Sequence, residues 1–204
     1  MRIALVAVLA LATAPLLAQT PPAGPPGTPD ATKIVSGTYQ VEPRHSQILF
    51  TVNHLGFTEY TGQFTQPTGT LVVDTSNPGN SKVDVTISID KVLTTVPALD
   101  AHLKTPDFFD AVKFPTAKFV STRVTVNGTT ATIAGDLTIK DVTKPVVLQA
   151  RFVGAGNATQ GAKKLNFGFA ATTSIKRSDF GITYLLPGVT DKVDLTINAG
   201  FVAQ

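Results

Sequence analysis

The chain has 204 residues, no cysteine, and 17 basic against 14 acidic side chains, which gives a formal net charge of +3. The absence of cysteine excludes disulfides, thiol catalysis and cysteine-ligated zinc. The charges of both signs are interspersed rather than gathered in a basic stripe with aromatic residues between them, so the sequence does not indicate nucleic-acid binding.

The N-terminal segment is typical of a secretory signal peptide. Residues 1–18, "MRIALVAVLALATAPLLA", carry one positive charge, a long Ala/Leu/Val run and small residues near the end. The apolar run is shorter than the roughly 18 or more residues of a membrane span, and no basic stop-transfer flank follows. We therefore expect cleavage near Ala18 and no stable membrane anchor.

A segment rich in proline and glycine follows the signal. Residues 19–36 include "TPPAGPPGTPDATK", in which proline and glycine disfavour both helices and the hydrogen-bond ladder of a sheet. We expect a flexible tether here. Residues 37–204 show an even composition without internal repeats, and their number fits one domain.

Strand patterns dominate that domain. In "KVDVTISID" the residues Val83, Val85, Ile87 and Ile89 share one face, and "KVDLTINAGF" repeats the alternation with an apolar face from Val193 to Phe201. The same criteria predict eight strands: 46–53, 60–74, 82–90, 116–127, 130–140, 145–154, 164–176 and 192–201.

Eight antiparallel strands, each apolar on one face, can close into a barrel or stack as a sandwich. Strands of about ten residues are longer than the usual five or six, which favours an elongated barrel. Its interior could be packed solid or left hollow for an apolar ligand, and the alternation of residues does not choose between these states.

One segment, "LDAHLKTPDFFDAVKFPTAKF" at 99–119, breaks the strand pattern. Helix-forming residues follow Pro97, and Leu99 and Leu103 lie four apart on one face, so we predict one or two helical turns. The apolar pair Phe108 and Phe109 comes next. This insertion would cap one barrel end, either as a plug that closes the core or as a lid over a cavity.

The three histidines do not form a metal-binding pattern. His45 and His54 are nine residues apart, and an odd separation along one strand places them on opposite faces. His102 has carboxylates nearby but no ligand spacing of the His-x-x-x-His kind. We predict no metal and no cofactor.

The sequence also lacks a convincing catalytic motif. There is no Gly-x-Ser-x-Gly, and Asp107 and Asp110 are better explained as turn carboxylates around an aromatic pair. The triplet "DFG" at 179–181 is not accompanied by the other kinase motifs. We predict that the protein is not an enzyme and has no catalytic residues.

Four stretches together carry a resemblance to a known family. "HSQILFTVNHLGFTEYTGQF", "LDAHLKTPDFFDAVKFPTAKFVS", "GDLTIKDVTKPVVL" and "IKRSDFGI" occur in the order typical of the YceI-like family of exported, lipocalin-like proteins. The resemblance implies an all-β fold, an eight-stranded antiparallel lipocalin-like barrel with a short helical insertion capping one end. It also implies a periplasmic location and a long-chain isoprenoid lipid, of polyprenyl or quinone type, inside the barrel.

The resemblance and the apolar residues of the predicted strands and insertion point to two groups of site residues. The expected ligand-binding residues are Ile48, Phe50, Val52, Leu103, Phe108, Phe109, Phe119, Leu137, Phe167, Phe169 and Phe180. The expected polar residues at the barrel mouth are His45, His54, His102, Arg177 and Asp179. Pro67 stands where the family pattern usually has an aromatic residue, so we expect a wider pocket there.

The leading functional hypothesis is therefore non-catalytic binding or carriage of the isoprenoid lipid. One alternative is an enzyme that acts on a lipid head group at the barrel mouth, and another is a stress-related structural barrel with a solid core. Each hypothesis involves neither nucleic acid nor a membrane anchor, and a homodimer is compatible with all of them.

Overall fold

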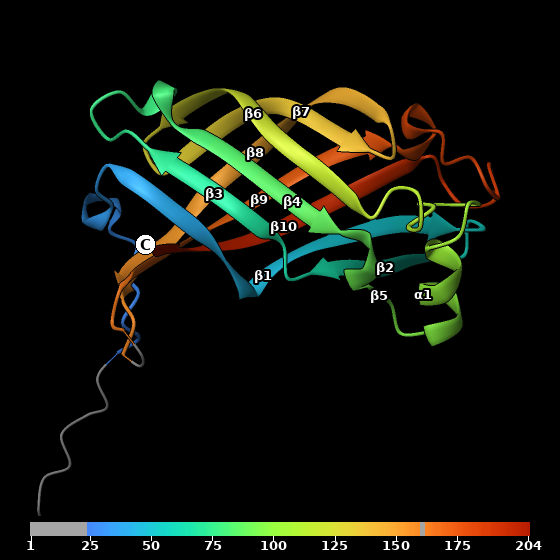
Figure 1. The fold of residues 1–204 in the computed structure, drawn as a ribbon, viewed down its shortest axis with the longest axis horizontal. Coiled ribbons are helices and arrows are strands. Elements are labelled where there is room, and N and C mark those ends of the chain that lie inside the picture. Colours follow the sequence, from blue (N-terminus) through green and yellow to red (C-terminus); the bar gives the residue numbers. More distant parts are fainter. Residues whose placement is uncertain (1–23, 160–161) are drawn as a thin grey trace, which may run out of the picture.

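The structure, a computed structural model, describes residues 24–159 and 162–204 (Figure 1). The expected signal peptide, 1–18, lies outside the described residues. Within them, no helix combines the length and the apolar character needed to cross a membrane.

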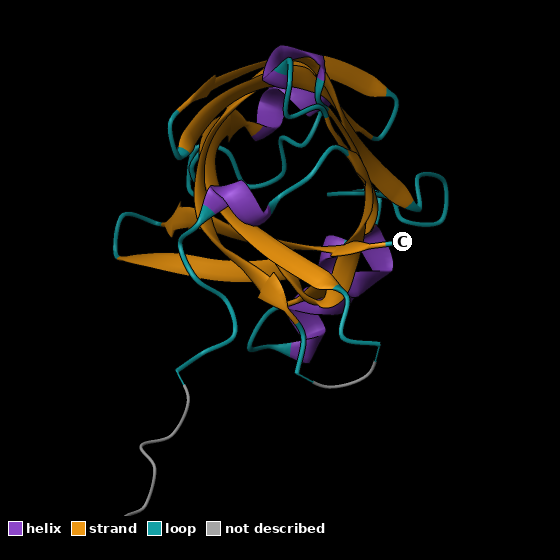
Figure 2. Cartoon of the chain, turned by 90° about the vertical axis from the view of Figure 1, so that its left-hand side faces the viewer, coloured by secondary structure: helices purple, strands orange, loops and turns teal. Residues whose placement is uncertain are grey.

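Eight antiparallel strands form a closed barrel, so the predicted fold class is confirmed. Each strand pairs with its neighbours in the order β10-β9-β8-β7-β6-β4-β3-β1, and pairing of β1 with β10 closes the ring, which Figure 2 shows end-on. The barrel strands are β1 Gly37–His54, β3 Thr68–Val73, β4 Lys82–Ser88, β6 Thr116–Asn127, β7 Thr130–Ile139, β8 Val142–Asn157, β9 Leu165–Lys176 and β10 Lys192–Ala203.

Two further strands, β2 (Thr58–Thr65) and β5 (Val92–Leu93), extend the sheet beside the second half of β1. The prediction of a single strand over 60–74 is wrong, because the chain breaks between β2 and β3. Gln66 has a positive φ of 55°, and Pro67 has no N–H to donate to a ladder. The first half of β1 then pairs with β3, and its second half pairs with β2.

The predicted helical insertion is present as α1, Pro97–Leu103, with proline at the first helical turn. It lies at the same barrel end as the β1–β2 turn and the loop between β9 and β10 (Figure 1). Four short 3-10 helices complete the fold: η1 Ala31–Lys33, η2 Pro78–Asn80, η3 Ile89–Lys91 and η4 Arg177–Phe180.

The expected tether, 19–36, is structured in its second half. Thr28 forms an antiparallel bridge with Ala155 of β8, through N–O distances of 3.0 and 2.9 Å. Ile34 packs against the buried residues at this barrel end. Residues 28–34 therefore lie along the barrel rather than extending away from it, because the end of β8 offers free backbone groups and the core offers an apolar contact.

The inward side chains form two buried clusters, one toward each end of the barrel. The cluster on the α1 side, here called the helix-end core, contains Ile48, Phe64, Ile89, Val92, Leu103, Ala117, Phe119, Leu137, Ile139, Val146, Phe180 and Ile182. The cluster beside the C-terminus, here called the terminal-end core, contains Tyr39, Val41, Leu71, Phe152, Ala155, Phe167 and Phe201.

Candidate ligand-binding cavity

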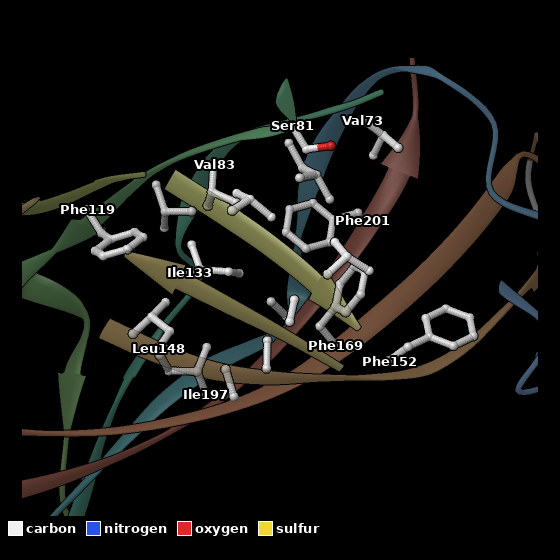
Figure 3. Close-up of a pocket in the computed structure, with 18 of the residues that line it drawn as sticks. Val73, Ser81, Val83, Phe119, Ile133, Leu148, Phe152, Phe169, Ile197 and Phe201 are labelled. Atoms are coloured by element: carbon white, nitrogen blue, oxygen red, sulfur yellow. The ribbon is translucent and has the colours of Figure 1, made fainter. Parts of the chain in front are cut away.

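A cavity of about 360 Å³ lies inside the barrel between the helix-end core and the mouth at the other end (Figure 3). All eight barrel strands contribute inward side chains to its wall. The main apolar contributors are Val41, Ile48, Leu71, Val83, Val85, Ile87, Phe119, Val124, Ile133, Leu137, Val146, Leu148, Ala150, Phe152, Phe169, Ala171, Leu195, Ile197, Ala199 and Phe201.

The hollow follows from the size of the inward residues. Most of the wall is aliphatic, and three adjacent strands, β8, β9 and β10, present the small side chains of Ala150, Ala171 and Ala199. Ala150 and Ala171 face each other in register across β8 and β9. Protein interiors otherwise pack as densely as organic crystals, so small residues that converge from neighbouring strands leave space that no other side chain fills.

The α1 end of the cavity is closed by packed side chains. The ring of Phe109 meets the ring of Phe64 edge-on, with centroids 5.4 Å apart, and Leu103 is buried in the same core. Neither Phe108 nor Phe109 lines the cavity. The insertion therefore acts as a plug, and the alternative of a lid across the cavity mouth is not what the structure shows.

The mouth lies at the opposite end, where the lining residues are exposed or half-buried. They come from three segments: η1, the loop from Asp74 to Ser81, and the β6–β7 turn around Gly128. Most of their polar groups are uncharged hydroxyls, contributed by Thr75, Ser81, Thr129 and Thr130. Figure 2 looks along the barrel from this side.

The cavity wall is almost free of charge. Among the described residues, Asp74 is the one lining residue with an ionisable side chain, and it lies at the rim. The backbone N–H of Asn77 donates to its carboxylate at 2.8 Å and lowers the pKa of Asp74, with help from Asn80 and Ser76. The carboxylate is thus committed to its own loop, and the wall offers an environment that favours apolar ligands.

The structure places four of the eleven expected ligand-binding residues in the cavity wall: Ile48, Phe119, Leu137 and Phe169. The other seven do not line it. Phe50, Leu103, Phe108, Phe109 and Phe180 belong to or pack against the helix-end core, Val52 follows Phe50 toward the β1–β2 turn, and Phe167 lies in the terminal-end core. These side chains were expected to point into the barrel, but they lie too far along the barrel axis to reach the cavity.

None of the five expected polar residues lies at the mouth. Arg177 is buried at the α1 end, where its guanidinium donates to the carbonyls of Thr190, Ile182, Tyr184 and Val189 at 2.8 to 3.2 Å. Burial lowers the pKa of Arg177, although these hydrogen bonds stabilise the charged form. Arg177 therefore holds the loop between β9 and β10 in place, while Asp179 beside it is exposed.

The three histidines lie apart from one another and from the cavity. The imidazole of His102 meets the carboxylate of Asp107 at 2.8 Å and stacks edge-on against Phe108 and Tyr184, with centroids 5.1 Å away in both cases. His45 pairs with Glu42 at 2.6 Å beside the irregular part of β1, and His54 ends that strand. Within 24–159 and 162–204, no three metal-ligating side chains gather into a site.

The aliphatic residues of the wall are the ones that the expected site omitted. Val83, Val85 and Ile87 line the cavity from β4, and β10 contributes Leu195 and Ile197. Their alternation predicts the inward face correctly, so the pattern itself contained the information. Pro67 also lines the wall, at the break between β2 and β3, and its side chain is buried.

Comparison with known proteins agrees with this geometry. Residues 39–201 match the family described as the YceI-like domain. The protein YceI of Escherichia coli is 38% identical over 176 residues, which cover 85% of this chain and 91% of the relative.

Two solved structures share the fold. The Campylobacter jejuni YCEI protein superposes with a TM-score of 0.63 at 29% identity, covering 74% of this chain and 90% of that protein. A domain from Saccharophagus degradans, described as polyisoprenoid binding and implicated in plant cell wall breakdown, gives a TM-score of 0.59 at 12% identity, with coverage of 81% and 98%. The latter likeness concerns the fold alone.

Proposed function

Because the chain belongs to the YceI-like domain family, we propose that it binds an isoprenoid lipid of polyprenyl or quinone type inside the barrel and performs no chemistry on it. The observation that carries this proposal is the apolar cavity of about 360 Å³. The description of the Saccharophagus degradans domain as polyisoprenoid binding adds support for the ligand class.

The chemistry of the wall suits such a ligand. A prenyl chain has no hydrogen-bonding groups, so it gives up no hydrogen bonds to water when it enters a cavity whose wall is mainly valine, isoleucine, leucine and alanine. Each buried methylene contributes about 0.8 kcal/mol, which over many carbons exceeds the cost of ordering a flexible chain. The hydroxyls of Thr75, Ser81 and Thr130 lie at the rim; each makes one hydrogen bond within the protein and retains the capacity for a second one to an uncharged head group.

Catalysis on a bound lipid finds little support in the side chains. The hydrogen-bonded pair of His102 and Asp107 is the best acid–base candidate, but it lies in the insertion at the closed end. At the mouth, the carboxylate of Asp74 already accepts hydrogen bonds from its own loop. A general base must reach the proton that it removes; the His102–Asp107 pair does not line the cavity, and the carboxylate of Asp74 at the rim is held by its own loop.

Gentle purification followed by organic extraction and mass spectrometry tests the proposal. We expect a prenyl lipid in near-stoichiometric amount from the wild-type protein. The variant Ala171→Leu, whose larger side chain projects into the cavity, is the matched control and should yield little or none. An empty wild-type protein that also fails to take up added prenyl alcohol would favour a purely structural barrel, and turnover of the added lipid would favour an enzyme.

We further propose that the protein acts in the periplasm, as the predicted signal peptide suggests. Intact-mass measurement of exported protein should give a chain that begins near Gln19. Recovery of a chain that retains Met1–Ala18 in the inner membrane would contradict this location.

A further inference from the structure

We propose that the closed end of the barrel carries a membrane-contact surface, where two exposed loops insert reversibly into the interfacial region of a phospholipid bilayer. The loops are the β1–β2 turn, with Leu55 and Phe57, and the loop between β9 and β10, with Tyr184 and Leu185. These four residues are here called the apolar tip. The inference is independent of what the cavity binds, since the cavity opens at the opposite end.

The two loops form one continuous surface. The backbone N–H of Leu55 donates to the carbonyl of Gly188 at 2.7 Å and so joins the first loop to the second. In Figure 1 both loops reach beyond α1 along the long axis of the barrel. The ring of Tyr184 packs edge-on against His102 and Phe108, with centroids 5.1 and 5.3 Å away. The apolar tip is therefore fixed to the packed end of the barrel.

The side chains of the apolar tip are more exposed than folding alone would favour. Phe57 is 84% exposed, and the other three are between 39% and 53% exposed. Residues 55–58 and 181–190 contain no Asp, Glu, Lys or Arg, so no charge within them has to leave water when the tip enters an apolar environment. Apolar side chains gathered at one exposed place are typical of a surface that contacts a protein or a membrane.

The backbone conformation of both leucines is unfavourable for their side chains. The φ angle is 55° at Leu55 and 58° at Leu185, in the left-handed region that suits glycine or asparagine. Neither leucine is buried, so packing in the core does not compensate for this cost. An exposed leucine in a strained conformation on each of two neighbouring loops indicates a role outside the folded core.

The backbone of the apolar tip already satisfies many of its own hydrogen bonds. The N–H of Gly56 donates to the side-chain oxygen of Asn53 at 2.8 Å, and that of Phe57 donates to the carbonyl of His54 at 3.0 Å. In the other loop, the N–H of Val189 donates to a carbonyl of the same loop at 2.9 Å. Because an unpaired backbone group is costly in a medium without water, these internal bonds lower the cost of insertion.

A bilayer fits this surface better than a second copy of the chain. A stable protein interface uses roughly 20 to 30 residues on each side, and the apolar tip is far smaller. Its side chains project from the extremity of the barrel, where a fluid bilayer can surround them and a folded surface would need a matching hollow. Tyrosine is favoured at the level of the head groups, and phenylalanine and leucine insert below it.

Fluorescence tests the proposal directly, because the chain contains no tryptophan. In Phe57→Trp of the exported protein, we expect a blue-shifted emission with phosphatidylcholine vesicles, and quenching when the acyl chains of the lipid are brominated. The matched control is Val35→Trp, at a residue that is 60% exposed and lies between η1 and β1 at the other end of the barrel. This control should show neither change, and a larger shift at Val35→Trp than at Phe57→Trp would overturn the proposal.

Co-sedimentation with phosphatidylcholine vesicles measures the contribution of each side chain. Phe57→Ser and Leu185→Ser should each weaken partitioning by about tenfold, because each removes a large apolar side chain from the contact. Val35→Ser should leave partitioning unchanged. All these variants share one N-terminus, so the differences between them report on the loops. Circular dichroism should show that the serine variants unfold at the same temperature as the wild type, since the replaced side chains are exposed.

Three results would overturn the membrane-contact surface and leave the proposed function intact. The first is partitioning that stays unchanged in both Phe57→Ser and Leu185→Ser. The second is binding that requires vesicles of phosphatidylcholine and phosphatidylglycerol in equal parts and disappears in high salt, which would indicate a charged surface elsewhere. The third is a wild-type dimer that Phe57→Ser dissociates in analytical ultracentrifugation, which would assign the apolar tip to a second copy.

Discussion

The two ends of this barrel are built from the same strands, but one end is packed and the other encloses a cavity. Toward α1, the interior is filled by rings from distant parts of the chain, including Phe64 of β2, Phe109 of the insertion and Phe180 of η4. Toward the chain termini, valine, isoleucine and alanine side chains together with the rings of Phe152, Phe169 and Phe201 surround a hollow of about 360 Å³. Alternation along the strands is the same at both ends, so the strands themselves do not decide where the barrel is solid.

The difference lies in what the connections between strands contribute. At the closed end, the α1 insertion and the loop between β9 and β10 add buried side chains to the interior. At the mouth, the Asp74–Ser81 loop and the β6–β7 turn form a rim of exposed residues instead. A barrel of this size therefore has a cavity at one end and a packed core at the other.

The largest expected effect is the loss of stability when a ring of the helix-end core is truncated, compared with the truncation of a residue of the cavity wall. Phe180 is 2% exposed, so Phe180→Ala should lower the free energy of unfolding by about 3–5 kcal/mol. Leu148→Ala should cost less, about 2 kcal/mol, because Leu148 is only half-buried at the edge of the helix-end core and part of its side chain already faces the cavity. Urea denaturation of the ligand-free proteins measures both values, and equal losses would contradict a solid end and a hollow end.

The second comparison concerns the loops that close the two ends. Arg177→Met removes the donor for four backbone carbonyls and should destabilise the protein by about 2–4 kcal/mol. Amide hydrogen exchange should rise mainly between residues 177 and 191. The control at the mouth, Asp74→Asn, keeps much of the hydrogen-bonding capacity of an exposed side chain and should be far milder. A loop that stays protected in Arg177→Met would show that the guanidinium does not hold it.

Two buried alanines allow a smaller but sharper comparison. Ala117 is 6% exposed within the helix-end core, and Ala171 is 8% exposed in the cavity wall. Ala117→Leu should cost about 1–3 kcal/mol, because it adds atoms to a packed region. Ala171→Leu should leave stability nearly unchanged while abolishing the co-purification of a prenyl lipid. A destabilised Ala171→Leu protein would mean that the hollow is smaller than described.

The smallest expected effect is the response to acid, which should be similar at both ends. Hydrogen bonds from the backbone of Ser178 lower the pKa of Asp191, and those from the backbone of Asn77 lower the pKa of Asp74. Because each folded-state pKa lies below the ordinary value of about 3.9, the stabilisation is complete above that pH and is lost as the pH falls through the folded-state value. Asp191→Asn and Asp74→Asn should each flatten the acid side of the stability curve slightly, and an unchanged curve would contradict these assignments.

Much of the fold could be predicted because it depends on local patterns. The period of two in "KVDVTISID" and "KVDLTINAGF" identifies β4 and β10 and their inward faces, and the helix formers after Pro97 identify α1. The break at Pro67 was harder to predict from the sequence, because the residues on both sides of it continue the strand pattern. Pro67 has no backbone N–H, but that this ends a strand becomes clear only when β2 and β3 are seen to pair with different halves of β1.

The sequence by itself thus determined the strand faces and the helical insertion and favoured a barrel, and only the tertiary structure decided which inward residues line the cavity. Alternation specifies a face and carries no information about height along the barrel axis, which depends on strand tilt and stagger. Ile48 and Phe50 share one face of β1, yet Ile48 lines the hollow and Phe50 packs against the helix-end core. Similarly, the type of residue at Arg177 suggests a head-group contact at the mouth, whereas the fold brings four carbonyls around its guanidinium at the closed end.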